Sequence, residues 1–378
     1  GHGNRYDMFD LQIERQPPLV DRRRRIPVAE RTDSRGVVVS PLDPESVAAA
    51  VAGLEAEGVE SVAVCLLHAY RNPLHEHDVA AAVAQRLPAV PVSVSSEVAP
   101  VIREYERTVA TVVNAYIAPR LSDYLGALGG ALHRRGYARE PRIMRSDGGW
   151  FSAAEAARSP VRILESGPAA GAIAAARTAV EQDAGLAIAF DMGGTTAKAC
   201  LVRDGEPAIA ETLEVSRLER FKKGSGLPVQ LPSVDLIEIG AGGGSIAALG
   251  PLGLLQVGPR SSGAAPGPAC YGRGGTSPTV TDADLVLRYL DPDYFAGGSV
   301  RLDAAAAHDA IAAALVASGA FADVTAAAWG IYDLVNENMA QAVRLHCVEH
   351  GVDPAGVALV ATGGAGPLHV AAIMDKIG

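Results

Sequence analysis

The residues most able to do chemistry in this sequence form the turn D-M-G-G-T-T at positions 191–196, which lies between two apolar runs. A strand that ends in aspartate and turns through Gly-Gly-Thr exposes backbone N–H groups with no side chain to keep an anion away, and the threonine hydroxyls add donors. Asp191 could orient Mg²⁺, and Lys198 brings a positive charge on the returning strand. A plain hairpin with glycines at positive φ explains the same residues, so both interpretations stay open.

A second glycine turn, G-G-A-G at positions 363–366, follows a β-branched strand and precedes a helix that begins at Pro367. The N-terminus of a helix favours negative charge, and bare backbone lets a nucleotide approach closely. The spacing matches neither the Walker P-loop nor the dinucleotide fingerprint G-x-G-x-x-G. By itself the turn therefore does not specify a ligand.

Asp235 and Glu238 lie on the strand that leads into a third glycine run, at positions 240–244. An acid that enters a glycine loop beside a nucleotide could bind Mg²⁺ or the substrate. Solvation of a strand edge is the alternative explanation for both carboxylates.

Histidines and cysteines do not form a convincing metal or nucleophile pattern. His75 and His77 point to different faces of a helix, and His346 and His350 lack the glutamate of H-E-x-x-H, so we expect polar residues at a helix start and partly exposed surface residues. Cys270 has no base nearby in sequence, which predicts an inert thiol.

The elements that must position these residues alternate between strands and helices. Asp43 is predicted to cap a helix near 44–57, and residues 60–67 are predicted to form a buried strand. A helix should start at Pro73, and the long helical pattern that follows should break or kink near Pro119. Residues 187–215 read as three strands of an antiparallel meander with a tight turn at 204–205, and residues 257–275 as a long ordered loop or lid. Helical patterns follow near 282–290, 303–318 and 325–350. We expect an α/β protein with one domain over residues 1–180 and a second over 181–378.

Composition excludes several classes of protein. The 378 residues carry a net charge of −10, which argues against nucleic acid as a partner, and no apolar run reaches the roughly 20 residues that a membrane span needs. Four scattered cysteines without a C-x-x-C pair suit a reducing compartment. These features predict a cytoplasmic location.

Four runs together carry a specific resemblance, namely FDMGGTTAKACLV, PSVDLIEIGAGGGSIA, VGPRSSGAAPGPACYGRGGTSPTVTDADLVL and LVATGGAGPLHVAA. They resemble the A-type subunits of the ATP-dependent hydantoinase and 5-oxoprolinase family, which includes the acetone carboxylase β subunit. VAVCLLHAYRNPLHEH, MRSDGGW and ESGPAAGA extend the resemblance over the first half of the chain. Family members begin with another D-x-G-G-T-F-T-D turn, which this sequence lacks.

The resemblance implies actin-like ATPase (ribonuclease H-like) domains with mixed sheets, in an apparently incomplete two-domain chain. It implies ATP and Mg²⁺ as cofactors, residues 191–196 as the phosphate turn of the second domain, and residues 363–366 as the adenosine turn. It further implies a B-type (α) partner subunit in a hetero-oligomer, and a small cyclic amide or ketone as substrate, whose carbonyl oxygen is phosphorylated before hydrolysis.

The candidate site residues are Asp191, Asp235 and Glu238 for catalysis, Asp191 for the metal, and Gly193, Gly194, Thr195, Thr196, Lys198, Gly242, Gly243, Gly363, Gly364 and Gly366 for the cofactor. The main hypothesis is an ATP-dependent cyclic amide hydrolase whose fragment alone is inactive. The alternatives are the β-type subunit of an ATP-dependent ketone carboxylase and a non-catalytic nucleotide-binding assembly module.

Overall fold

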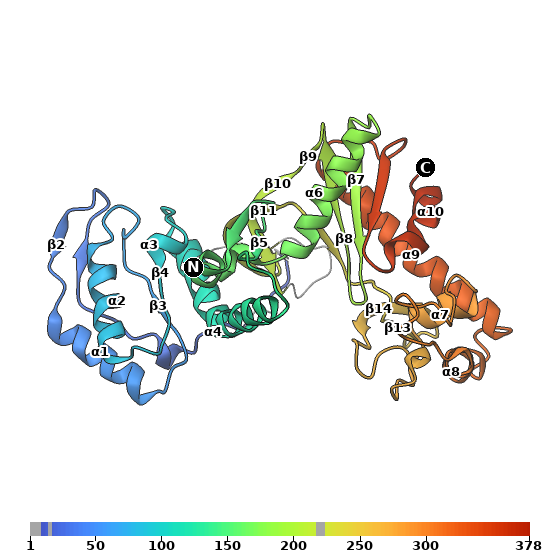
Figure 1. Ribbon diagram of the computed structural model, residues 1–378, viewed down its shortest axis with the longest axis horizontal. Helices are drawn as coiled ribbons and strands as arrows, with labels where there is room; N and C mark the ends of the chain where they lie inside the picture. Colours follow the sequence, from blue (N-terminus) through green and yellow to red (C-terminus); the bar gives the residue numbers. More distant parts are fainter. Residues whose placement is uncertain (1–8, 14–16, 217–223) are drawn as a thin grey trace. The chain divides into compact units, whose positions relative to one another are not determined.

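The chain forms two compact units in a computed structural model that describes residues 9–13, 17–216 and 224–378 (Figure 1). The first unit comprises Gly1–Ala169 and Ile209–Val234, and the second comprises Ala170–Ala208 and Asp235–Gly378. The sequence predicted one boundary at residue 180. The structure instead returns residues 209–234 to the first unit, so the chain passes between the units three times.

The first unit contains short two-stranded sheets and helices. Its elements are η1 (Arg22–Arg24), β1 (Arg31–Thr32), β2 (Val38–Ser40), α1 (Pro44–Ala56), β3 (Val62–Val64), α2 (Leu74–Arg86), β4 (Val92–Val94), α3 (Ser95–Val98), α4 (Glu104–Arg134), β5 (Arg142–Met144), β6 (Trp150–Ser152), α5 (Ala153–Arg158), η2 (Pro160–Ile163), β10 (Ile209–Val215) and β11 (Leu227–Val234).

The predicted alternation of strands and helices is confirmed in this unit. The carboxylate of Asp43 accepts hydrogen bonds from the amides of Glu45 and Ser46 and so caps α1. The parallel strands β3 and β4 are joined through α2, and valines from α1, α2 and both strands form one apolar core. The helix α4 runs over 31 residues without interruption through Pro119, where a break or kink was predicted. It packs against β11 in a second core.

The second unit is built on a mixed sheet. Its elements are α6 (Ser166–Glu181), which begins in the first unit, and β7 (Leu186–Met192), β8 (Ala197–Arg203), β9 (Glu206–Pro207), β12 (Ile237–Ile239), β13 (Ser245–Leu249), β14 (Leu255–Ser261), η3 (Ala269–Tyr271), α7 (Val280–Val286), α8 (Ala304–Ile311), a π-helical turn η4 (Ala312–Val316), α9 (Val324–Glu349), β15 (Ala358–Thr362) and α10 (Gly366–Ile377).

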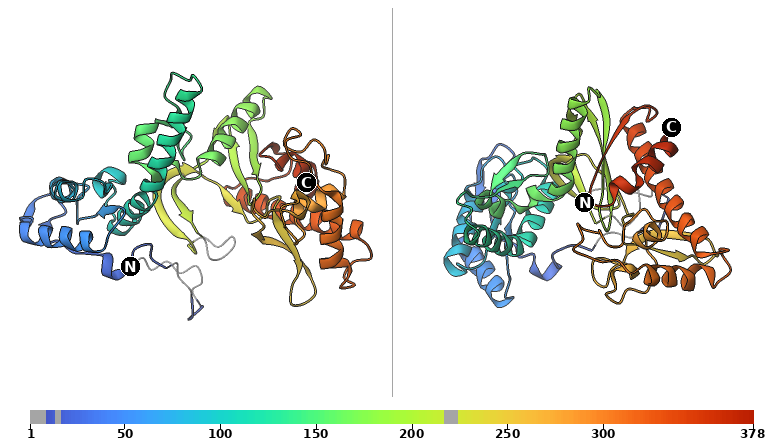
Figure 2. Two further views of the ribbon diagram at one scale, coloured as in Figure 1. Left: turned by 60° about the horizontal axis from the view of Figure 1, so that its bottom comes forward. Right: turned by 45° about the vertical axis from the view of Figure 1, so that its right-hand side comes forward.

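The strand order of this sheet is β12-β8-β7-β15, with β9 paired to the far end of β8. The strand β15 is parallel to β7, whereas the other pairs are antiparallel. The helices α9 and α10 pack along the sheet (Figures 1 and 2). The end of β7 and the end of β15 therefore lie at the same edge, and each runs into one of the two glycine turns.

The predicted three-stranded meander is only partly present. The turn at Asp204–Gly205 has positive φ at both residues, as a tight hairpin turn requires. After it, only Glu206 and Pro207 pair with β8, and Ile209–Val215 leaves to pair with β11 in the first unit. The amide of Ala208 still donates to the carbonyl of Leu201 on β8 at 2.8 Å, and the segment departs from β8 after this bond.

The segment 257–275 is more ordered than a simple loop. Its first residues belong to β14, which pairs with β13, and a short 3-10 helix covers Ala269–Tyr271. The helices α7, α8 and α9 confirm the three predicted helical patterns within a few residues. No helix in the described ranges is both long and apolar enough to cross a bilayer.

Candidate functional site

Three of the predicted side chains lie in one row across the sheet of the second unit. Asp191 on β7 pairs with Lys198 on β8, and Lys198 pairs with Glu238 on β12. Residues directly opposite on neighbouring strands point to the same face, so the row presents acid, base and acid side by side. The Nζ of Lys198 lies 3.9 Å from Oε1 of Glu238. Thr362 on β15 continues the row beside Asp191.

The third glycine run lies directly on the 191–196 turn. The amide of Gly243 donates to the carbonyl of Gly193 at 3.0 Å, and the amide of Gly244 donates to the carbonyl of Gly194 at 2.6 Å. A Cβ on Gly242 would lie only 2.6 Å from the backbone carbon of Thr195. Bare backbone at this position is therefore needed for the two segments to touch.

These contacts change the function predicted for Gly242 and Gly243. Both were candidates for cofactor binding, but the amide of Gly242 donates to Oγ of Ser245 at 2.9 Å and that of Gly243 to Gly193. Because both donors already have protein acceptors, the two glycines hold the turn in place and do not offer it N–H groups.

The 363–366 turn supports the same edge from the other side. The amide of Ala365 donates to the carbonyl of Met192 at 3.0 Å. Gly363 has φ +81°, and a Cβ there would collide with Oδ1 of Asp191 and with the carbonyl group of Met192. Gly364 is exposed, and Gly366 begins α10. The two glycine turns predicted 170 residues apart are thus in direct contact.

The outer side of the 191–196 turn keeps its donors. In the part of the chain that the structure describes, the amides of Gly194, Thr195 and Thr196 and the hydroxyls of both threonines have no hydrogen-bond partner. Gly194 and Thr195 are exposed. The amide nitrogen of Thr195 lies close to Gly242, where an added Cβ would come within 2.7 Å of it. A turn with amides that have no protein acceptor can accept an anion.

The glycines of this turn are not required by its backbone. Gly193 and Gly194, both within the described ranges, lack a positive φ, and a Cβ on Gly194 would meet nothing within 4 Å. The plain-hairpin interpretation explained these glycines by a positive φ, and the structure contradicts that explanation. A side chain at Gly194 would therefore be tolerated by the described part of the chain.

The structure does not bring Asp235 into the row. Its carboxylate lies 3.0 Å from Nε2 of His350 at the end of α9, and its amide donates to Ala208. The prediction of partly exposed histidines holds for His350 but is wrong for His346, which is buried inside α9. No cluster of three or more potential metal-ligating side chains occurs in the described ranges.

Two residues of α7 that were not among the candidate site residues, Thr281 and Asp282, contact the 240–244 glycine run and the Gly- and Pro-rich segment 257–275. The hydroxyl of Thr281 donates to the carbonyl of Gly243 at 2.8 Å, and the buried carboxylate of Asp282 accepts from the amides of Ala269, Cys270 and Thr279. The capping pattern T-x-x-D at 279–282 was a visible signal for a helix start directly after the Gly- and Pro-rich segment.

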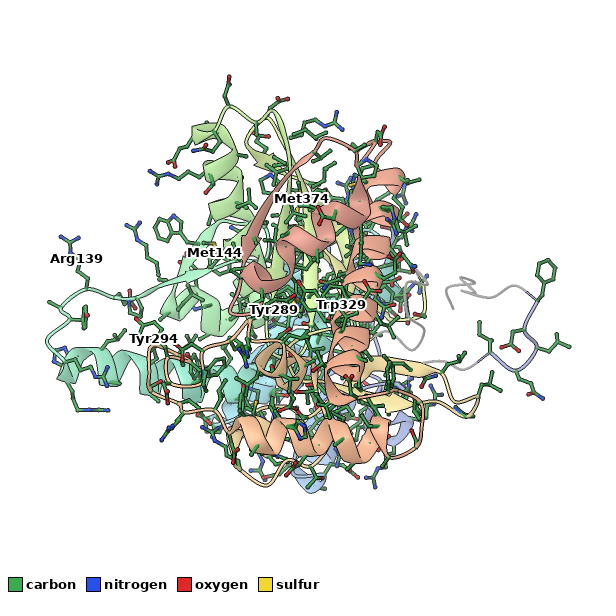
Figure 3. All side chains as sticks on the ribbon, turned by 90° about the vertical axis from the view of Figure 1, so that its right-hand side faces the viewer. Arg139, Met144, Tyr289, Tyr294, Trp329 and Met374 are labelled. Carbon is green, nitrogen blue, oxygen red and sulfur yellow. The ribbon has the colours of Figure 1, made fainter. Side chains whose placement is uncertain are left out.

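A buried acid and histidine join α7 to α10. Nε2 of His369 lies 3.4 Å from Oδ2 of Asp284, and both side chains are at most 2% exposed. Burial raises the pKa of Asp284, while the neighbouring histidine opposes that rise. His369 also stacks on Tyr332, which is flanked by the partly exposed rings of Tyr289 and Trp329 (Figure 3).

The cysteines are free thiols, and Cys200, Cys270 and Cys347 are buried. Burial raises the pKa of Cys65 and Cys200 to about 12 and also raises that of Cys270. Because the thiolate is the nucleophile, we expect iodoacetamide at pH 8 to leave the folded protein essentially unlabelled. Mass spectrometry after denaturation should show four alkylated cysteines. Rapid labelling of Cys270 in the folded protein would contradict its assignment as an inert thiol.

A mixed sheet whose edge is lined by three glycine segments defines the class of α/β fold, and comparisons with known proteins define the family. Residues 107–378 match the model of the hydantoinase/oxoprolinase family, and residues 1–87 match that of its N-terminal region. The chain belongs to the hydantoinase/oxoprolinase family.

Several relatives are characterised. The chain is 38% identical to caprolactamase subunit alpha of Pseudomonas jessenii over 379 residues, which is 100% of this chain and 52% of the relative. It is 31% identical to 5-oxoprolinase 1 of Arabidopsis thaliana, covering 100% of this chain and 31% of the relative. The chain spans about half or less of the length of these curated relatives.

Two solved structures share the fold. A nucleotide-free acetone carboxylase structure, described as part of a mechanism of ATP-dependent acetone carboxylation, aligns with a TM-score of 0.83 at 31% identity, covering 96% of this chain and 50% of that one. The ATP-dependent caprolactamase from P. jessenii aligns with a TM-score of 0.74 at 38% identity, covering 100% of this chain and 53% of that one.

Proposed function

We propose that this chain provides a phosphate-binding turn of an ATP-dependent enzyme that phosphorylates the carbonyl oxygen of a small cyclic amide before the ring is hydrolysed. Relatives named caprolactamase and 5-oxoprolinase act on cyclic amides, and the caprolactamase is described as ATP-dependent. Phosphorylation of the oxygen withdraws electrons from the amide carbon, so that water can add to it. The C–N bond then breaks with protonation of the nitrogen, which opens the ring, and hydrolysis of the resulting acyl phosphate releases the carboxylate and inorganic phosphate.

One observation carries the proposal. The carbonyls of Gly193 and Gly194 accept from Gly243 and Gly244, while the amides of Gly194, Thr195 and Thr196 and the hydroxyls of both threonines have no hydrogen-bond partner among the described residues. Fixed N–H donors without protein acceptors can neutralise charge on phosphate oxygens without reorganising during the reaction. The nearby 363–366 turn and the start of α10 supply more bare backbone at the same edge.

The residues present fit a magnesium ion better than a metal held by protein alone. Mg²⁺ usually binds through one or two carboxylates and completes its shell with water and phosphate oxygens. Asp191 is the carboxylate beside the turn, its side chain is only partly buried, and the lack of a Cβ on Gly363 avoids a collision with its Oδ1. The ion would supply positive charge to the phosphates, and Asp191 would hold it at the end of β7.

A ketone substrate is the second candidate. The acetone carboxylase structure aligns with a TM-score of 0.83, against 0.74 for the caprolactamase structure. In either case the oxygen that accepts phosphate is a carbonyl oxygen, so the same phosphate turn serves both.

We further propose that Glu238, with Lys198 beside it, faces the reacting groups from β12. Asp235 has a structural function through its contact with His350. The enzyme works in the cytoplasm.

Partner subunits are part of this proposal. The relatives include proteins named as the alpha subunit of a caprolactamase and the beta subunit of an acetone carboxylase. We propose that a B-type subunit completes the hydrolysis or carboxylation within a hetero-oligomer, and that the two units of this chain correspond to the two actin-like ATPase domains of the family.

Replacement of Asp191 by asparagine tests the proposed metal ligand. Calorimetry with the unmodified chain should show tighter binding of ATP with Mg²⁺ than with a chelator. Asp191→Asn keeps the shape but removes the charge, so we expect Mg-ATP affinity to fall at least tenfold, about 1.4 kcal/mol, and the effect of Mg²⁺ to disappear. Asp204→Asn makes the same change at the other end of the β7–β8 pair, and it should change neither the Mg-ATP affinity nor the effect of Mg²⁺.

Three outcomes decide between the hypotheses. A well-folded unmodified chain that does not bind ATP would defeat the proposal for the site in this chain. Equal loss in both variants would show a general electrostatic effect and remove Asp191 from the site. Normal binding without turnover of lactams, hydantoins, 5-oxoproline or ketones in the presence of a B-type subunit would favour the non-catalytic assembly module.

A further inference from the structure

The helix α7 is short and buried, and it bonds to the glycine run next to the phosphate turn. Thr281 uses both of its donors on a single acceptor, because its amide and its hydroxyl each lie 2.8 Å from the carbonyl oxygen of Gly243. A Cβ on Gly243 would lie 2.8 Å from Oγ1 of Thr281. The glycine is therefore clamped between α7 and the turn.

From Gly243 the connection continues into the turn itself. The amide of this residue donates to Gly193, and the next amide, of Gly244, donates to Gly194. The carbonyl of Gly244 in turn accepts from the amide of Ser262 at 2.9 Å. A movement of α7 would thus be transmitted through one residue to the backbone of the 191–196 turn.

The other end of α7 reaches the second glycine turn. Asp284 faces His369 in the first turn of α10, directly after residues 363–366. Nδ1 of His369 lies 3.0 Å from Oδ1 of Asn336 on α9, and the hydroxyl of Tyr332 donates to the carbonyl of Leu368. The carboxylate of Asp282 accepts four hydrogen bonds from residues 269, 270 and 279, which hold α7 against the segment that precedes it.

We propose that α7 sets the distance and orientation of the two glycine turns relative to each other, with Thr281 and the Asp284–His369 pair as positioning residues for the nucleotide. This inference rests on the proposed function, in which both turns hold one ligand. The groups that bind and orient a substrate must be held within about 0.5 Å of their productive positions, and a misplacement of about 1 Å lowers the reaction rate about a hundredfold. A rigid buried helix that touches both turns meets that requirement, whereas two separate loops would not.

Hydrogen exchange of the chain without nucleotide tests the inference independently of ATP. Thr281→Val removes the hydroxyl donor but keeps the backbone bond to Gly243. We expect the amides of Gly193, Gly243 and Gly244 to exchange about tenfold faster, since one net hydrogen bond corresponds to roughly that factor. Thr281→Ser should restore the protection. The matched control is Thr111→Val, where another buried hydroxyl donates to the carbonyl of Arg107 on α4 at 2.7 Å.

Mg-ATP titration of the same variants completes the experiment. Thr281→Val should bind about tenfold more weakly, and Thr281→Ser and Thr111→Val should bind as the unmodified chain does. If Thr281→Val leaves exchange at the glycine runs unchanged, the inference is overturned whatever ATP does. If exchange rises but the unmodified chain does not bind Mg-ATP, the proposed function fails and the connection through α7 stands.

A second variant covers the case in which Thr281→Val does not fold. Asp284→Asn keeps the size of the side chain and removes its charge beside His369. Faster exchange at the amides of Ala365 and Leu368, with weaker Mg-ATP binding, is expected. Unchanged exchange and unchanged affinity in this variant would remove the link between α7 and α10.

Discussion

Replacing Gly363 by alanine is expected to destabilise the second unit more than any other single methyl group added at the site. The residue has φ +81°, which costs an L side chain roughly 1–3 kcal/mol. The new Cβ would also collide with Oδ1 of Asp191 and the carbonyl oxygen of Met192, and would lie 2.8 Å from the carbonyl carbon of Met192. Because two of these atoms belong to the backbone of β7, the collision cannot be relieved by rotating a side chain.

We expect a loss of about 3–5 kcal/mol in the free energy of unfolding, within the range of strong backbone mutations. Urea denaturation followed by circular dichroism measures it. Gly364→Ala is the matched control, since its Cβ would meet nothing within 4 Å and its φ is not positive. If Gly363→Ala were as stable as this control, the contact between the two glycine turns would be wrong.

Replacing Gly194 by alanine is expected to have the opposite profile, with a large effect on binding and almost none on stability. The added methyl meets nothing within 4 Å, and the φ of Gly194 is accessible to alanine, so the fold should tolerate it or gain up to about 1 kcal/mol from the stiffer unfolded chain. The same methyl would stand on the exposed surface of the turn, where the proposed phosphate has to approach. We expect Mg-ATP affinity to fall by about a hundredfold, since the phosphate would lose close contact with several donors.

Calorimetry and thermal melting of the same samples separate the two effects. Gly126→Ala on α4 is the control, because that glycine is also exposed and has nothing within 4 Å of its Cβ position. It should melt slightly higher and bind normally. Unchanged affinity in Gly194→Ala would show that the nucleotide does not approach the outer side of this turn.

The sequence alone predicted much of the local structure around the site. The two glycine turns, the strands before them and the helices of the second half were readable, because apolar runs, glycine and capping residues act over a few neighbours. The pairing of Asp191 with Lys198 also follows locally, since a four-residue connection between β7 and β8 leaves few registers open. The resemblance to the family rested on these same short runs.

Long-range pairing was not readable in the same way. Nothing between residues 206 and 215 indicated that this segment would leave the meander for β11, because a strand pattern shows which face is apolar and not which strand lies beside it. The hydrogen bonding of Gly242 and Gly243 was not readable for a related reason. A bare amide looks available in a sequence, and only the structure shows that Gly193 and Ser245 already accept from these amides.

The sequence by itself thus determined which backbone segments are bare and where carboxylates stand beside them, because residue type and neighbouring pattern decide local conformation. Only the tertiary structure decided which side of each segment is used. The carbonyls of Gly193 and Gly194 are bound by residues some 50 positions away and the parallel strand beside the turn comes from 170 positions away, whereas the amides of Gly194 to Thr196 have no partner among the described residues. That division depends on strand order and on α7, which arise from packing over the whole unit and leave no mark on the turn itself.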